Sequence, residues 1–338
     1  MNSSSVKRIY DLGFPWQTQD PFLFCVHHED FYPKGNVDLG PATTLTGRNI
    51  GNDFTIKDGF RMYHGRTVPG FPAHPHRGFE TITVVRKGLV DHADSAGGAG
   101  RYGNGDVQWM TAGKGLQHSE MFPLLNKKKD NPFELFQIWI NLPKKDKFAE
   151  PYFKMLWSED QAREKFLDQN GKSTEIEIVA GKIMKETVSP APNSWAADPK
   201  NNVLVWNIKI EANGSFEIPL QAQGVNRNLY FYKGDHLLID QVKVNVYKGV
   251  ELNASEKTII KNGNQEARIL LLQGKPINEP VVQHGPFVMN THEEIREAIN
   301  DYQNTHFGGW PWDRTDKHHG PNKGRFAKHA DGTIEERD

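Results

Sequence analysis

Short apolar runs recur along most of the chain, and each run is closed by glycine, asparagine or proline. In the first half the clearest runs are 81–85, which is rich in β-branched residues, and 134–140. Runs of this kind between turn residues predict strands of a sandwich or barrel rather than helices. The second half repeats the plan, with strand-like runs at 175–180, 203–210, 215–220, 228–232, 237–247 and 267–273. We therefore expect an all-β protein with two β-barrels in tandem and a few short helices.

Two stretches predict helices by their N-terminal capping boxes. Ser158 and Gln161 predict a helix that starts at residue 158. Thr291 and Glu294 predict another, because apolar residues follow them at helical spacing as far as the glycines at 308 and 309. One amphipathic helix near the C-terminus is thus expected to pack on a barrel.

The last stretch, from Trp310 onward, is aromatic at first and then polar. We expect a solvated tail, with metal binding by His318, His319 and His329, or a clamp over a neighbouring subunit, as the alternatives. The expected domains are 1–148 with a metal site, 149–290 without one, and 291–338 as helix and tail.

Composition narrows the function classes. The chain has 338 residues and a formal net charge of −1, so no overall field attracts it to nucleic acid or anionic lipid. Its single cysteine, Cys25, excludes an internal disulfide framework, and its apolar neighbours predict a buried strand cysteine. The early apolar run at 22–26 is too short for a signal or membrane segment. We expect a soluble cytoplasmic protein.

Two pairs of metal-binding side chains lie at strand spacing: His74 with His76, and His118 with Glu120. Residues i and i+2 of a strand share a face, so each pair points one way. If the two strands face each other in a barrel, three imidazoles and one carboxylate converge and leave about two positions of an octahedral ion open. Such a set suits Fe(II), Mn(II), Co(II), Ni(II) or Cu(II) better than a closed structural Zn(II) site.

Other candidate sites are weaker. Gly98, Gly100 and Gly103 match a dinucleotide-binding pattern, but 106–110 reads as a strand, so no helix N-terminus follows for a pyrophosphate. The second half has no histidine between His236 and His284. We expect one metal ion per chain, no organic cofactor, and a structural or partner-binding role for the second barrel.

The motifs at 74–81, 105–113, 118–120 and 283–291 closely resemble the pirin family of bicupins, over about residues 35–308. The resemblance implies two cupin barrels, with Fe bound in the first by His74, His76, His118 and Glu120. Glu80 occupies the place of the usual cupin carboxylate ligand, yet the pirin pattern assigns Glu120. Glu80 is then expected to orient a ligand or to hydrogen-bond in the core.

The resemblance supports two principal hypotheses. The first is an Fe(II)-dependent dioxygenase that opens the central ring of a flavonol such as quercetin with O₂, with Glu120 also acting as a base. Near the ligands, Phe79, Trp109, Met110 and Met121 line the pocket or belong to the core. The second is a metal-dependent, redox-sensing protein that binds a transcription factor or metabolic enzyme, with 127–129 and 144–147 as a basic contact face. A third is metal-assisted isomerisation or hydrolysis of a small sugar or acid.

Overall fold

A computed structural model describes residues 4–184, 186–221 and 223–337. The chain divides into two compact units, each made of separate segments. We call the first the histidine unit; it comprises His27–Ile138, Leu142–Ser158 and the chain from Glu279 onward. The second unit comprises the chain up to Val26, Trp139–Asn141 and Glu159–Asn278. The domain boundaries expected from the sequence are continuous ranges, and they stay a prediction.

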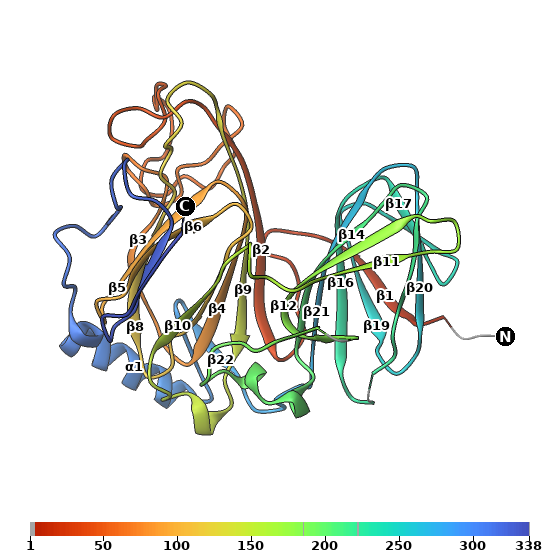
Figure 1. Ribbon diagram of the computed structural model, residues 1–338. Helices are drawn as coiled ribbons and strands as arrows, with labels where there is room; N and C mark the ends of the chain where they lie inside the picture. The colour runs from red at the N-terminus through yellow and green to blue at the C-terminus, as the bar shows by residue number, and fades with distance from the viewer. Residues whose placement is uncertain (1–3, 185, 222, 338) are drawn as a thin grey trace. The chain divides into compact units, whose positions relative to one another are not determined.

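Two main sheets build the histidine unit, and two of their strands, β2 and β9, continue beyond its residue ranges (Figure 1). The five-stranded sheet has the order β10-β7-β4-β9-β2 and contains β2 (Phe22–Tyr32), β4 (Phe79–Lys87), β7 (Val107–Thr111), β9 (Asn131–Asn141) and β10 (Tyr152–Leu156). The six-stranded sheet has the order β25-β24-β6-β5-β8-β3 and contains β3 (Gly70–His76), β5 (Leu89–Asp94), β6 (Ala99–Gly103), β8 (Leu116–Met121), β24 (Phe326–Lys328) and β25 (Ile334–Glu336). The expected strands at 81–85, 106–110 and 134–140 are confirmed, because the β-branched and aromatic residues there pack on both faces of a sheet.

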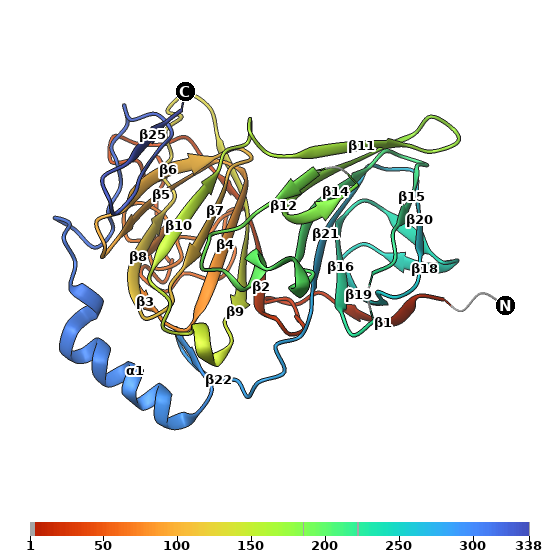
Figure 2. The same cartoon turned by 60° about the horizontal axis from the view of Figure 1, so that its bottom comes forward.

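The second unit also contains two sheets (Figure 2). The larger contains β1 (Val6–Asp11), β11 (Arg163–Leu167), β12 (Ser173–Ile183), β13 (Glu186–Val188), β14 (Leu204–Ile210), β16 (Asn226–Lys233), β19 (Lys248–Asn253) and β21 (Ala267–Gly274). The smaller contains β15 (Ser215–Ile218), β17 (His236–Ile239), β18 (Val242–Asn245) and β20 (Thr258–Asn262). Buried aliphatic and aromatic side chains from both sheets fill the core, with Trp206 and Leu229 among them.

The α-helix α1 (His292–Thr305) is the only one in the described part of the chain, and it begins with the predicted capping box. The Thr291 hydroxyl accepts from the Glu294 amide, and the Glu294 carboxylate accepts from the Thr291 amide. The helix ends at Thr305, before the expected glycines, and is followed by His306, whose φ is 48°. Its apolar face packs on the short hairpin of β22 (Val282–His284) and β23 (Phe287–Met289). The remaining helices are short 3₁₀ turns at Lys144–Asp146, Trp195–Ala197, Pro199–Asn201 and His306–Gly308.

Two expectations from the sequence are wrong. No helix starts at Ser158; its amide donates to the Asp106 carboxylate instead, and the chain continues into β11, which pairs with β12. Cross-strand pairing therefore outweighs the local capping signal there. The last stretch is not a solvated tail either, because β24 pairs with β6 and buries Phe326 and Ala327.

Cys25 is a buried strand residue, as expected, and burial raises the pKa of its thiol well above the ordinary value. Within the described ranges, no helix is both long enough and apolar enough to span a membrane.

Candidate metal centre

Strands β3 and β8 bring the predicted histidines together. They pair antiparallel with His74 opposite His118, so both side chains and that of His76 lie on the same face of the sheet. The register shifts between Phe71 and His74, where β3 carries one residue more than β8. Bulges of this kind redirect side chains, and here the bulge immediately precedes the first ligand candidate.

The three imidazoles form a compact cluster. One ring nitrogen from each of His74, His76 and His118 lies within 4.8 Å of the others. His76 and His118 are buried, at 3% and 0% exposed, while His74 is half-buried. Burial lowers the pKa of His74 to about 4 and holds the pKa values of His76 and His118 well below their ordinary value. The rings are therefore neutral near pH 7, which is the form that binds metals.

Glu120 lies beside this cluster but is held by other side chains. Thr83 donates to its Oε1 at 3.0 Å, and the Gln137 amide donates to its Oε2 at 3.0 Å. Its Oε2 is 3.8 Å from Nε2 of His118, which is too far for a hydrogen bond. Burial raises the pKa of the Glu120 carboxyl, while the Thr83 hydrogen bond opposes the shift. The carboxylate thus lies next to the His118 imidazole and is oriented by two polar partners, but it is not part of the group of three ring nitrogens that lie within 4.8 Å of one another.

Glu80 occupies the opposite face of β4. It is separated from Thr83 by three positions, and odd separations on a strand change face. It is fully buried and accepts a hydrogen bond from the Thr111 hydroxyl at 2.6 Å. This arrangement matches the expected core hydrogen bond and separates Glu80 from the face that carries Thr83 and Glu120.

The four apolar residues expected near the ligands are all fully buried. Phe79 adjoins the cluster, with its ring centroid 5.0 Å from that of His76. Met110 packs in the main core of the unit, whereas Met121 packs in a small cluster with Leu39 and Val68. Trp109 lies on the other face of β7 from Met110. Phe79 therefore packs directly against a predicted ligand.

Sequence reasoning missed a buried pair on β5. His92 is directly opposite Glu120 in the β5–β8 pairing, and its ring centroid is 5.6 Å from that of His118. Its Nε2 is 3.0 Å from Oδ2 of Asp94. The Oδ1 atom of Asp94 accepts from the amides of Ala96 and Gly98, both at 2.9 Å. The spacing of His92 and Asp94 on a strand is the same i, i+2 signal that identified the other pairs.

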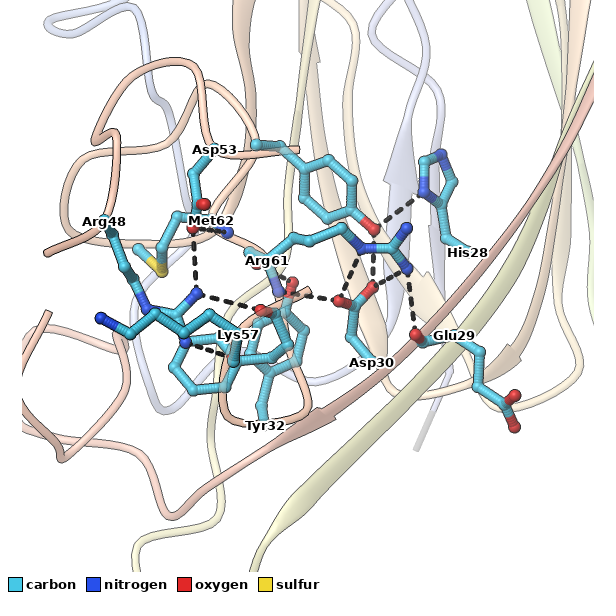
Figure 3. Close-up of polar contacts among 11 residues, drawn as sticks. His28, Glu29, Asp30, Tyr32, Arg48, Asp53, Lys57, Arg61 and Met62 are labelled. Atoms are coloured by element: carbon cyan, nitrogen blue, oxygen red, sulfur yellow. Dashed lines mark hydrogen bonds and ion pairs between the residues drawn. The ribbon is translucent and has the colours of Figure 1, made fainter. Parts of the chain in front are cut away.

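A second polar network in the histidine unit surrounds Asp30 and Arg61 (Figure 3). Asp30 is fully buried and accepts from Nε and Nη2 of Arg61, both at 3.0 Å. The Tyr63 hydroxyl donates to Asp30 at 2.6 Å and lies 2.8 Å from Nδ1 of His28. The ring of Tyr63 packs on Phe71, which in turn contacts the His74 ring at a centroid distance of 6.2 Å.

Both lysine runs have exposed members, and Lys144 and Lys145 of the second run are exposed too. Residues 127–129 are exposed, as a contact face requires. Lys147, in contrast, is buried, and its ammonium donates to the carbonyl oxygens of Gly78 and Val288 at 2.9 and 3.0 Å. Burial lowers the pKa of Lys147 to about 8. Lys147 therefore has a structural role inside the unit rather than a place on a basic surface.

The cluster fits a divalent metal ion by its chemistry. His118 is fully buried, and neither of its ring nitrogens has a hydrogen-bond partner among the described residues. A buried polar group without a partner costs about 1–3 kcal/mol, and a metal ion would provide the missing interaction. Three neutral imidazoles with an adjacent carboxylate are ligands that late first-row metals accept.

Comparison with known proteins identifies the family. Residues 40–140 match the family model described as Pirin, and residues 205–308 match the Pirin C-terminal cupin domain. Human pirin is 32% identical over 254 residues, which cover 74% of this chain and 81% of pirin. The chain belongs to the pirin family. A pirin-like protein of Solanum lycopersicum is 37% identical over 240 residues, covering 69% of this chain and 75% of the relative.

A solved structure shows the same fold as this pirin-family chain. The crystal structure of a quercetin 2,3-dioxygenase from Acinetobacter baumannii superposes with a TM-score of 0.69 and 26% identity, covering 90% of this chain and 96% of the other. The mostly β, two-cupin fold with one C-terminal helix is thereby confirmed.

Proposed function

We propose that this pirin-family protein is a metal-dependent dioxygenase that opens the central ring of a flavonol such as quercetin, with Fe(II) as the metal. The cluster of His74, His76 and His118 carries the proposal, because one ring nitrogen from each lies within 4.8 Å of the others and burial keeps the rings neutral, the form that binds metals. The fully buried His118 adds support, since neither of its ring nitrogens has a hydrogen-bond partner among the described residues. Similarity to the Acinetobacter baumannii quercetin 2,3-dioxygenase supports the choice of substrate. Mn, Co, Ni, Cu or Zn in place of Fe would use the same residues.

The proposed ligands are His74, His76, His118 and Glu120. When bound, the metal supplies Lewis-acid and one-electron chemistry at its open positions. The three imidazoles are carried by the paired strands β3 and β8, so their geometry is set before the metal binds. Phe79 contributes an apolar wall next to His76 and excludes water from that side.

Glu120 is proposed to act also as the base that takes the proton from the hydroxyl of the flavonol. Its raised pKa, caused by burial, makes it a stronger base than an exposed carboxylate. Thr83 and Gln137 orient the carboxylate by donating to its two oxygens. Phe71 is half-buried and contacts His74, and we propose that its ring packs against the flat aromatic rings of the substrate.

Oxygen consumption tests this proposal. The Fe(II)-loaded protein is expected to consume O₂ when quercetin is added, and the metal-free protein is not. Glu120→Gln should reduce turnover by at least about 100-fold if the residue is a general base. Glu80→Gln is the matched control, because Glu80 is also a buried glutamate but lies on the face of β4 opposite Thr83, which contacts Glu120, and the variant should retain metal and turnover.

The outcomes separate the hypotheses. Equal loss in the Glu80 and Glu120 variants would contradict the role of Glu120. Absence of O₂ uptake by the wild type with iron confirmed bound would count against a flavonol substrate. That result would favour the metal-dependent binding protein, for which the exposed lysines at 127–129 would be the first contact residues to replace.

A further inference from the structure

The C-terminal segment of residues 310–337, here called the tail, lies beyond both ranges that match the family models, 40–140 and 205–308. The tail nevertheless belongs to the histidine unit. Its strand β24 pairs antiparallel with β6, with Phe326 opposite Arg101, and β25 pairs with β24 (Figure 2). The tail therefore extends the sheet that contains β3 and β8.

The tail covers a buried ion pair on the outer face of this sheet. Asp91 and Arg101 are 0% and 1% exposed and form two hydrogen bonds, of 2.6 and 2.7 Å. The amide of His319 donates to Oδ2 of Asp91 at 2.8 Å. The guanidinium of Arg101 donates to the carbonyl oxygen of Lys323 at 2.7 Å. Both charges thus obtain part of their hydrogen bonding from the tail.

Three further contacts reach the backbones of β3, which carries two of the proposed ligands, and of β5, which pairs with the ligand strand β8. The Trp312 indole donates to the Asp94 carbonyl oxygen at 2.8 Å. Nε2 of His319 lies 2.9 Å from the carbonyl oxygen of His92, and because a carbonyl only accepts, the ring nitrogen is the donor. The amide of Ala73 donates to the tail at the Thr315 carbonyl, also at 2.8 Å.

These contacts coincide with the residues next to the metal cluster. Ala73 immediately precedes His74 and lies in the bulge of β3, where the ladder with β8 is interrupted. His92 and Asp94 pair with Glu120 and His118 on β8. The tail thus binds, from the outer face, the two strands on either side of β8.

We propose that the tail positions the metal ligands, with Trp312 and His319 as its positioning residues. This inference rests on the proposed metal site. A ligand set binds metal well only when its geometry is held to about 0.5 Å. Outside partners that hold ligands in place typically contribute 10- to 100-fold to metal affinity. Here the partners act through the strand backbones rather than through the imidazoles.

Metal titration of the full-length protein tests the proposal, with Co(II) as the probe because its visible spectrum reports coordination geometry. The double variant Trp312→Phe, His319→Phe keeps an aromatic ring at both positions and removes both side-chain donors. Its dissociation constant for Co(II) is expected to rise by about 10-fold, with a shifted Co(II) spectrum. Trp310→Phe is the matched control, because its indole donates within the tail, to the Arg314 carbonyl at 2.9 Å, and it should bind as the wild type does.

Thermal unfolding of the metal-free variants separates positioning from plain stabilisation. A lower melting temperature with unchanged affinity and spectrum would overturn the proposal, and so would an equal loss of affinity in Trp310→Phe. If the double variant does not fold, Trp312→Phe alone decides, with a rise of about 3-fold expected as the smaller share of that effect. If the wild type does not bind Co(II), the proposed metal site itself fails.

Discussion

The burial of the three histidines predicts an unusual pH dependence of metal affinity. A histidine with an ordinary pKa of about 6.5 binds metal about 10-fold more weakly at pH 5.5 than at pH 7.5, because protons compete for its nitrogen. Three such histidines would weaken binding by about 1,000-fold. The pKa of His74 is about 4, and those of His76 and His118 are also well below the ordinary value. Proton competition at these rings should therefore be almost absent in this range.

For Glu120, in contrast to the histidines, we expect proton competition to weaken metal binding as the pH falls. Burial raises the pKa of its carboxyl, so a proton competes with the metal at higher pH than for an exposed glutamate. If Glu120 is a ligand, affinity falls by at most about 10-fold per pH unit below that pKa, the limit for one proton. Glu120→Gln cannot take up this proton. The variant should bind more weakly overall, yet its affinity should vary by less than about 3-fold between pH 7.5 and 5.5.

The measurement is a Co(II) titration of both proteins at pH 7.5, 6.5 and 5.5, with circular dichroism to verify that each remains folded. If the Co(II) affinity of the Glu120→Gln variant fell 1,000-fold between pH 7.5 and pH 5.5, the reasoning would be refuted, since such a loss requires histidines with ordinary pKa values. Identical, flat profiles for the wild type and the variant would show instead that the Glu120 carboxyl does not exchange a proton for the metal.

Three further predictions concern stability, measured by denaturant unfolding of the metal-free protein. Gly78→Ala should destabilise by at least about 2 kcal/mol, since Gly78 has a φ of 86° and an added Cβ would lie 2.0 Å from the Val288 carbonyl oxygen; an unchanged midpoint would contradict this. Asp30→Asn should cost about 3 kcal/mol because it leaves Arg61 without its buried carboxylate, and a loss below 1 kcal/mol would refute it. Lowering the pH from 7 to 5 should cost about 2 kcal/mol through His74 alone, because the unfolded state binds more protons between its pKa of about 6.5 and the folded value of about 4. A His74→Asn variant should lose that part of the pH dependence.

Local spacing was sufficient for the central features of the site. His74, His76 and His118 lie on one face because side chains of a strand alternate, and the β-branched run at 81–85 makes β4 of the other sheet of the unit. The capping box at Thr291 likewise defines the start of α1, since its hydrogen bonds join residues three positions apart. Each of these features depends on neighbours in the chain, so the printed sequence contains the signal.

Only the tertiary structure decided the features that depend on distant partners. Glu120 is oriented by Thr83 and Gln137, from two other strands, and no local pattern links them. The stretch after Ser158 forms β11 rather than a helix, because pairing with β12 outweighs a single capping signal. The tail is polar in sequence, yet β24 buries part of it against β6. Desolvation and strand pairing act between segments that meet only after folding, and they set the pKa values and the supports of this site.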